Sequence, residues 1–269
     1  MERHEEAFEL ACDLVRNHPR SVSAHLEHGR ALYQRGRLEE SLGSFTAALG
    51  LDPHEYQALF NLGALHFELG NLADAEDFFL KAIALDTSRT EAQHNLALLW
   101  FGQSRLTEAD EMLRALLSRE PNGPSFALLG QVLLATGHTV EAVAAFERSL
   151  EMQRAWAVRA NLAEALARCF RYQEALDALR IALAEAPEAE RAALQFMCAQ
   201  LAMTSGNQAE AVQALKACLA ADPSADLGEQ ASSLLDRLEG RVPAKPIVRT
   251  RTSGIWKGLF SNRGVPAAR

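Results

Sequence analysis

The sequence predicts an all-α fold, a solenoid built from stacked antiparallel helix pairs. Three observations support this prediction. Prolines recur at a spacing close to 34 residues or twice that, six segments superimpose at the same period, and apolar residues recur at helical spacing while strand signals are nearly absent. The prolines that mark the period are Pro19, Pro53, Pro121, Pro187 and Pro223.

The first predicted element, residues 1–20, corresponds to the second half of a repeat. Ala7, Leu10 and Leu14 keep the helical register, and Pro19 closes the segment. A lone second helix leaves one apolar face that needs a cover. Because the ends of a solenoid need a solubilising helix, we expect an N-terminal half-repeat that acts as a capping helix, with contact to a partner as the alternative.

Residues 22–223 are predicted to form six repeats, each a helix, a tight turn and a second helix. The repeats begin at Val22, Tyr56, Thr90, Gly123, Trp156 and Ala192. Their eighth residues are small, namely Gly29, Gly63, Ala97, Gly130, Ala163 and Ala199. Their twentieth residues are also small, namely Ser41, Ala75, Ala109, Ala142, Ala175 and Ala211. Their twenty-fourth residues are large and apolar, namely Phe45, Phe79, Leu113, Phe146, Leu179 and Leu215. Small residues let two helix backbones approach closely, and the large residue fills the space between them.

The turn inside each repeat usually holds a glycine, which suits a left-handed cap at the end of the first helix. These glycines are Gly36, Gly70, Gly137 and Gly206. The fifth repeat has Phe170 in this place, and two extra residues link it to the sixth repeat. We expect altered curvature at these two junctions.

This period and its small–small–large–Pro template resemble the tetratricopeptide repeat family. Residues that carry the resemblance are Leu62, Gly63, Ala75, Phe79 and Ala82. The resemblance covers 202 of the 269 residues. It implies a right-handed α-solenoid whose first helices line a concave groove, and a protein-binding function without catalysis.

Two further segments follow the repeats. Residues 224–240 are predicted to form a C-terminal capping helix with one apolar stripe and a polar outer side. The stripe consists of Leu227, Ala231, Leu234, Leu235 and Leu238. Residues 241–269 are predicted to be a basic flexible tail, because they hold seven Lys or Arg, no acid, and several Gly and Pro.

The tail contains an apolar cluster flanked by bases, which we interpret as a docking motif. The cluster consists of Ile255, Trp256, Leu259 and Phe260. A partner protein, an anionic membrane surface and the protein's own acidic groove are all candidate targets, and a tail without function is the alternative. A partner protein is favoured over a peripheral membrane contact, because one short cluster gives only weak lipid affinity.

Composition and charge exclude several protein classes. The chain is 48% hydrophobic, which excludes wholesale disorder, and no apolar run approaches the roughly 18 residues of a membrane-spanning helix. Residues 1–20 carry charges throughout and lack the apolar core of a secretory signal, so we expect a cytoplasmic protein. The net charge is −8, and residues 1–240 alone reach −15. Such an acidic body repels phosphate backbones, so no nucleic-acid partner is expected.

No catalytic, cofactor-binding or metal-binding constellation is found. The sequence contains no phosphate-binding glycine loop, no H-E-x-x-H and no G-x-S-x-G. His25 and His28 have the spacing of a metal pair but occupy packing positions. The cysteines form no C-x-x-C pair and are expected to be buried, reduced thiols; they are Cys12, Cys169, Cys198 and Cys218. We therefore expect a protein without enzymatic activity, cofactor or metal.

The resemblance places positions 2, 5, 6, 9, 12 and 13 of each first helix on the inner wall. The residues predicted to line a peptide-binding groove are Phe60, Asn61, Phe67, His94, Asn95, Phe101, Gln131, Asn161, Arg168 and Met203. The inner positions also include Leu128, Leu134, Phe196 and Met197. Asn recurs at position 6, and a carboxamide can both donate to and accept from an extended peptide backbone. The aromatic and Met side chains would offer apolar pockets. The alternative is that Asn only supports its helix.

Some relatives bind the acidic C-terminus of heat-shock chaperones through a clamp of Lys and Asn side chains. The matching positions here are Leu26, Arg30, Asn61, Glu91 and Asn95. Only Asn61 fits, and Glu91 would repel a carboxylate, so this ligand is not expected.

The main functional hypothesis is a non-enzymatic protein–protein interaction scaffold that holds a peptide or helix of a partner in its concave groove. The acidic body favours neutral or basic ligands. The alternative is an assembly or regulatory factor that is recruited to a complex or membrane surface through its basic, Trp-containing tail.

Overall fold

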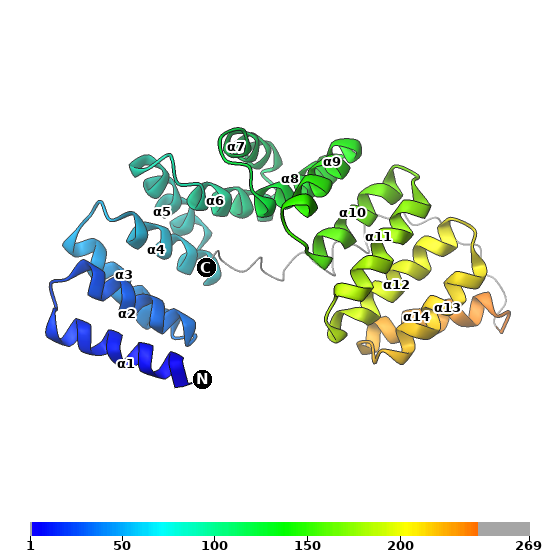
Figure 1. Ribbon diagram of the computed structural model, residues 1–269, viewed down its shortest axis with the longest axis horizontal. Helices are drawn as coiled ribbons and strands as arrows, with labels where there is room; N and C mark the ends of the chain where they lie inside the picture. Colours follow the sequence, from blue (N-terminus) through cyan, green and yellow to red (C-terminus); the bar gives the residue numbers. More distant parts are fainter. Residues whose placement is uncertain (1, 242–269) are drawn as a thin grey trace. The chain divides into compact units, whose positions relative to one another are not determined.

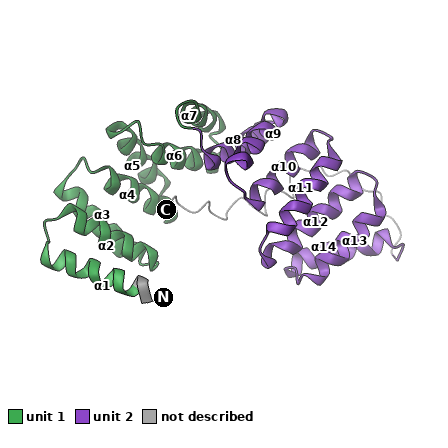
Figure 2. Cartoon of the chain, in the orientation of Figure 1, with its two compact units in different colours: residues 1–120 green, residues 121–269 purple. Residues whose placement is uncertain are grey.

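The computed structural model describes residues 2–241, with side-chain environments from residue 5 onward. This part of the chain contains fourteen helices and no strand (Figure 1). The predicted all-α fold is therefore confirmed. The chain divides into two compact units, Met1–Glu120 and Pro121–Arg269 (Figure 2). The predicted docking motif of the tail falls outside the described residues.

Unit 1 consists of one helix followed by three antiparallel pairs. Its helices are α1 (Glu2–Asn17), α2 (Val22–Gln34), α3 (Leu38–Leu51), α4 (Tyr56–Glu68), α5 (Leu72–Leu85), α6 (Glu91–Gly102) and α7 (Leu106–Arg119). Within each pair α2 packs on α3, α4 on α5 and α6 on α7. Contacts of α3 with α4 and of α5 with α6 join successive pairs, and α1 packs on α2.

Unit 2 consists of three pairs followed by one helix. Its helices are α8 (Gly123–Thr136), α9 (Thr139–Met152), α10 (Trp156–Arg168), α11 (Tyr172–Glu185), α12 (Glu188–Thr204), α13 (Gln208–Ala220) and α14 (Ala225–Leu238). The same pairing recurs, α8 with α9, α10 with α11 and α12 with α13, and α14 packs on α13. The helices α1 and α14 thus occupy the segments in which capping helices were predicted.

Side-chain caps set several helix boundaries. The Ser21 hydroxyl accepts a hydrogen bond from the Ala24 N–H at 3.2 Å where α2 begins, and the Asn122 side chain accepts one from the Ser125 N–H at 2.9 Å where α8 begins. These oxygens satisfy N–H groups that have no partner within the first turn of a helix. At its other end, α8 stops at Gly137, whose φ of 86° continues no right-handed helix.

The two helices of a pair approach most closely where a glycine meets a phenylalanine ring. A Cβ atom on Gly130 of α8 would lie 2.5 Å from Cε1 of Phe146 in α9. The equivalent contacts of Gly29 with Phe45 and of Gly63 with Phe79 would each measure 2.7 Å. These rings are at most 2% exposed, and burial of each stabilises the fold by about 2–3 kcal/mol. The other three repeats combine alanine at the eighth position with leucine at the twenty-fourth.

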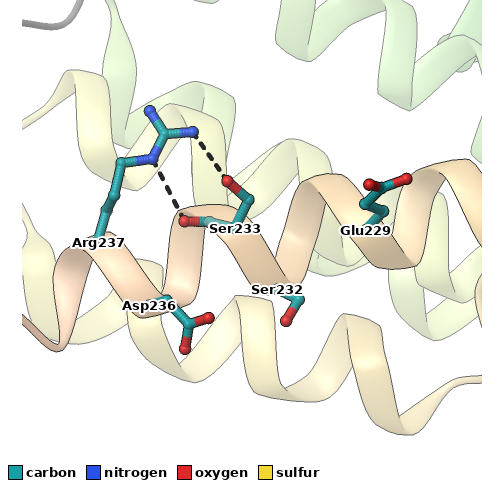
Figure 3. Close-up of a pocket in the computed structure, with 5 residues that line it drawn as sticks. All are labelled: Glu229, Ser232, Ser233, Asp236 and Arg237. Atoms are coloured by element: carbon teal, nitrogen blue, oxygen red, sulfur yellow. Dashed lines mark hydrogen bonds between the residues drawn. The ribbon is translucent and has the colours of Figure 1, made fainter. Parts of the chain in front are cut away.

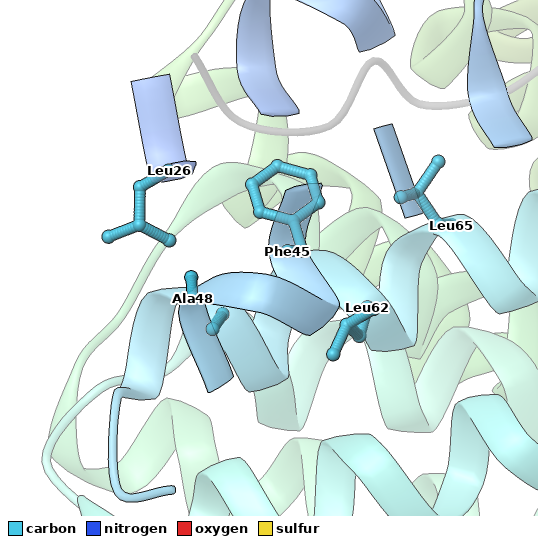
Figure 4. Packing of buried hydrophobic residues seen from close by; sticks show 6 residues of the cluster. Leu26, Phe45, Ala48, Leu62 and Leu65 are labelled. Atoms are coloured by element: carbon cyan, nitrogen blue, oxygen red, sulfur yellow. The ribbon is translucent and has the colours of Figure 1, made fainter. Parts of the chain in front are cut away.

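Apolar contacts then join one helix pair to the next. In unit 1, Phe45 of α3 packs with Leu26 of α2 and with Leu62 and Leu65 of α4 (Figure 4). Ala48 lies in the same cluster. Because α3 contributes to its own pair and to the following one, its buried face is shared, and neither pair covers its apolar surface alone.

The N-terminal helix is held on α2 through an aromatic ring. Phe8 of α1 stacks on His28 with ring centroids 6.1 Å apart, and the Arg35 guanidinium lies 4.0 Å from the Phe8 centroid. Arg35 also forms an ion pair with Glu5. The contact therefore combines apolar burial with a cation–π attraction.

Left-handed turns end the first helix of every repeat, including those without glycine. Phe170 has a φ of 62° and Ser104 has a φ of 63°. The Phe170 N–H donates to the Ala167 carbonyl at 3.0 Å, as the Gly70 N–H donates to the Phe67 carbonyl at 3.1 Å. The local turn at Phe170 is therefore the ordinary one, and the residue bears the strain of the positive φ. The altered curvature expected at this junction stays a prediction.

The longer link between the fifth and sixth repeats is absorbed by a helix. α12 begins at Glu188, four residues before Ala192, the position that the repeat period predicts. Glu188 and Glu190 lie in its first turn, where negative charge is stabilised by the helix dipole. The extra residues thus lengthen α12 by about one turn.

We expect Gly130→Ala to lower the free energy of unfolding by about 1–3 kcal/mol, because the new methyl group overpacks against Phe146. Urea denaturation followed by circular dichroism measures the change. Gly43→Ala is the matched control, since Gly43 is also helical but has open space at its Cβ position. Helix propensity then predicts stabilisation of about 0.5–1 kcal/mol. Combining Gly130→Ala with Phe146→Leu should recover part of the loss; an undiminished stability of Gly130→Ala would contradict the close contact.

We expect Phe170→Gly to raise the free energy of unfolding by about 0.5–1 kcal/mol, because glycine adopts the left-handed turn without strain. The Phe170 side chain is 79% exposed, so little packing is lost. The thermal denaturation midpoint measures the gain. Val140→Ala is the control, since Val140 is also highly exposed but has no positive φ. A lower midpoint for Phe170→Gly would show that the ring makes a stabilising contact.

Candidate protein-interaction surface

The first helices of the three pairs in unit 1 lie side by side. Arg30 of α2 donates from Nη2 to Gln57 Oε1 of α4 at 2.8 Å, and the Tyr33 hydroxyl forms a hydrogen bond with Glu68 of α4. α4 also contacts α6. We call the surface that these helices form the inner face of unit 1. Its residues are Glu27, Arg30, Tyr33, Gln57, Phe60, Asn61, Phe67, Glu68, Glu91, His94, Asn95 and Phe101.

The ten predicted groove residues fall into two sets, one in each unit. Unit 1 holds Phe60, Asn61, Phe67, His94, Asn95 and Phe101, and unit 2 holds Gln131, Asn161, Arg168 and Met203. All ten are half-buried. They are therefore neither core residues nor fully solvated ones, which is the environment expected for side chains that line a binding surface.

Asn61 has hydrogen-bonding capacity that unit 1 leaves unused. Its Nδ2 atom is buried and has no hydrogen-bond partner among the described residues. The neighbouring Phe60 ring stacks on Tyr56 and tilts against Phe79, with both pairs of centroids 6.2 Å apart. Packed aromatic rings thus stand beside an unsatisfied donor, and such a donor costs about 1–3 kcal/mol until it finds an acceptor.

An aromatic residue recurs at position 12 in all three repeats of unit 1. We call Tyr33, Phe67 and Phe101 the aromatic row; each keeps part of its surface exposed. Phe67 and Phe101 were predicted as groove residues, and Tyr33 was not. The signal was available in the sequence, because Tyr33 stands one repeat period before Phe67. In unit 2, Met203 is the only half-buried large residue at this position.

The inner face of unit 1 carries an excess of negative charge. Glu27, Glu68 and Glu91 are its acids, and all three are exposed. Arg30 is its one always-charged base, and it is already paired with Glu27 at 2.8 Å. Burial lowers the pKa of His94 to about 4, so this imidazole is neutral at pH 7. The face is therefore suited to a basic ligand.

The predicted groove residues of unit 2 offer less to a ligand. Arg168 forms an ion pair with Glu164 and donates to the Leu134 carbonyl at 3.0 Å, so its guanidinium links α10 to α8. The inner-wall positions at Leu128, Leu134, Phe196 and Met197 are buried core residues. These four side chains are therefore not available to form the predicted pockets beside Gln131, Asn161 and Met203.

The histidines and cysteines set aside as metal ligands have other roles. His25 Nε2 lies 2.9 Å from the Pro19 carbonyl oxygen, and His28 Nδ1 lies 2.9 Å from Ser44 Oγ. Cys198 and Cys218 are buried, and burial raises the pKa of Cys198 to about 12. Cys12 and Cys169 are only half-buried, so the expectation of four buried thiols is half right. No group of three potential metal ligands occurs in residues 2–241.

A shallow, open pocket lies elsewhere, on the polar side of α14. It is lined by Glu229, Ser232, Ser233, Asp236 and Arg237 (Figure 3). The Arg237 side chain donates to the Ser233 carbonyl at 3.3 Å and to its hydroxyl at 3.2 Å. All five residues come from one helix, and all but the half-buried Asp236 are exposed. The pocket is therefore separate from the predicted site.

Comparison with known proteins identifies the family. The family model described as Tetratricopeptide repeat matches residues 1–55, 26–90, 127–190 and 171–226, which together cover well over half of the chain. The chain belongs to the tetratricopeptide repeat family. Proteins of this family generally act as protein-interaction scaffolds that bind protein partners, and their fold is typically non-catalytic.

Solved structures confirm the fold at low sequence identity. The chain resembles one in the Cut9–Hcn1 hetero-tetramer of APC/C, with a TM-score of 0.71, 21% identity, and coverage of 87% of this chain and 46% of that one. It thus spans less than half of that protein's length. It also resembles pilF of Pseudomonas aeruginosa, with a TM-score of 0.68, 20% identity, and coverage of 79% and 97%.

A third structure similar to this tetratricopeptide repeat protein is YrrB, described as a TPR protein with an unusual peptide-binding site. The TM-score is 0.58, the identity is 22%, and the coverage is 70% of this chain and 97% of YrrB. No curated protein matches the sequence. Among the described helices, none has both the length and the apolar character needed to cross a membrane.

His94 predicts a stability that depends on pH. Its pKa of about 4 in the folded chain lies below the ordinary value of 6.5, so its contribution is complete above pH 6.5 and is lost as the pH falls toward 4. We expect the free energy of unfolding to drop by about 1–2 kcal/mol between pH 7 and pH 5. Urea denaturation at both pH values measures this drop. His94→Gln should show a smaller drop, and the exposed His54→Gln should behave as wild type; equal drops in all three would contradict burial of the imidazole.

Proposed function

We propose that the inner face of unit 1 binds an extended or helical segment of a partner protein and performs no catalysis. The observation that carries the proposal is Asn61, whose buried Nδ2 lacks a partner in the described chain. Because Asn61 as a whole is half-buried, rotation of its side chain would bring Nδ2 to the surface, where a backbone carbonyl of a bound segment could accept from it. This hydrogen bond would satisfy the donor. Binding would then recover the free energy that the unsatisfied donor costs the free chain.

The neighbouring side chains fit the same role. Asn95 occupies the equivalent position in the next repeat, so two carboxamides stand one repeat apart along the face. The aromatic row supplies apolar surface for the ligand's side chains, and aromatic residues are common anchors at protein interfaces. Hydrogen bonds to the backbone would then fix the direction of the segment, and the aromatic contacts would supply most of the affinity.

The family supports this proposal at the level of the fold. YrrB is described as having a peptide-binding site, and the matched chain of the Cut9–Hcn1 structure belongs to a hetero-tetramer. Unit 1 has the better-suited face because unit 2 buries its corresponding apolar residues. The excess of carboxylates on the face favours a ligand with Lys or Arg beside its apolar residues.

We expect Asn61→Ala combined with Asn95→Ala to remove partners from a cross-linked pull-down of the full chain, identified by mass spectrometry. The double variant takes away the polar anchors but leaves the buried apolar residues in place. Gln173→Ala combined with Gln213→Ala is the control, because these are exposed amides on α11 and α13. Circular dichroism of both variants checks that they keep their helices. Full retention of every partner by a folded Asn61/Asn95 variant would falsify the assignment of this face.

A second candidate function places the interaction in the tail. The seven bases of residues 241–269 and the acidic remainder of the chain favour recruitment to a complex or an anionic membrane surface through the tail. Deletion of residues 241–269 separates the two functions. Unchanged pull-down partners favour the inner face, whereas lost localisation with retained binding favours the tail.

A further inference from the structure

The inner face of unit 1 presents apolar and acidic groups together. Tyr33 is 36% exposed, and Phe67 and Phe101 are half-buried, so the aromatic row remains accessible to solvent. Accessible apolar surface with a polar rim is typical of an interaction site. The rim here is acidic, because Glu27 and Glu91 are exposed on the flanking helices α2 and α6.

The one always-charged base of this face, Arg30, pairs with Glu27 and leaves Glu91 without a base of the face. Arg30 is shared between Glu27 and Gln57, at 2.8 Å from each. Unit 1 as a whole contains 20 acids and 11 bases, so no general excess of positive charge offsets them. An occupant of this face therefore needs two properties. It must carry several bases and no acids, and it must contain an apolar cluster that can pack on the aromatic row.

One segment of this chain has both properties. Residues 242–269 contain six Lys or Arg and no acid. They also include the apolar cluster already defined at Ile255, Trp256, Leu259 and Phe260. The cluster begins 14 residues beyond Arg241, so an extended linker allows it to reach up to about 50 Å from the end of the described chain.

We propose that residues 249–263 of this chain's own tail bind the inner face of unit 1, with Trp256 and Phe260 against the aromatic row and the flanking bases beside Glu27 and Glu91. The inference rests on the proposed function, since the tail uses the surface assigned to partner segments. A tethered segment has an effective concentration of about a millimolar, so even a weak contact keeps the face occupied. The tail thereby competes with partners, and a partner binds only when it displaces the tail.

The first experiment measures binding of a fluorescent peptide with the sequence of residues 249–263. The peptide is titrated into the full wild-type chain and into the full chain carrying Trp256→Ala and Phe260→Ala, and anisotropy is recorded. Because the altered tail no longer competes, we expect the peptide to bind the variant about tenfold more tightly than the wild type. Equal affinities for the two chains, or no binding to either, would overturn the proposal.

The second experiment locates the peptide on the molecule. In the Trp256/Phe260 variant, further substitution of Glu27→Gln and Glu91→Gln should weaken peptide binding several-fold, because the ligand's bases lose two counter-charges. Glu39→Gln with Glu111→Gln is the matched control, since both residues are exposed acids on the second helices α3 and α7. A loss that is equal in the control would mean a general charge effect and would refute the assigned face.

Two further arms separate this inference from its competitors. A peptide with Trp256, Leu259 and Phe260 replaced by Ala keeps every charge, and we expect it not to bind; binding of this peptide would contradict apolar docking. Peptide binding to mixed phosphatidylcholine–phosphatidylserine vesicles but not to the protein would overturn the inference in favour of a membrane target. If the Asn61/Asn95 variant loses its partners while the peptide fails to bind, the proposed function stands and the tail contact falls.

Discussion

The fold depends on one close contact, the approach of the two helices within each repeat. At Gly29, Gly63 and Gly130 there is no room for a Cβ atom, because a phenylalanine ring of the paired helix occupies the space. The volume of the two positions is shared, so a larger residue on one helix requires a smaller one on the other. This constraint fixes how near the helices lie. It thereby fixes which faces remain for the next repeat and for a ligand.

Most of the architecture could be predicted from the sequence because repetition amplifies a weak signal. A single glycine or alanine at one position says little, but six small residues at the same repeat position identify the helix contact. The starts of the first helices followed in the same way, except that α6 starts at Glu91 instead of Thr90 and α12 at Glu188 instead of Ala192. The sixth repeat keeps the predicted register from Ala192 onward. The residues before Ala192 extend α12 at its N-terminus, because acids are favoured in the first turn of a helix.

Burial could be predicted less well than position. The repeat period places Phe60 and Phe196 at the same inner position, yet Phe60 keeps exposed surface and Phe196 is 1% exposed. How much of a side chain stays exposed depends on the neighbours from adjacent repeats, which differ from one unit to the other. The division at Glu120 and Pro121 likewise has little mark in the period, since the spacing changes there by one residue only, from 34 between Tyr56 and Thr90 to 33 between Thr90 and Gly123.

The aromatic row also limits how precisely the face can fix the register of a bound ligand. Tyr33, Phe67 and Phe101 occupy the same position in consecutive repeats. A segment anchored by one apolar side chain would therefore have three similar binding positions. Sliding by one repeat exchanges one ring for another at little cost. Only features that occur once on the face, such as Arg30 or the imidazole of His94, can fix the alignment. A short ligand would therefore occupy several registers, and a longer one would be needed to select a single register.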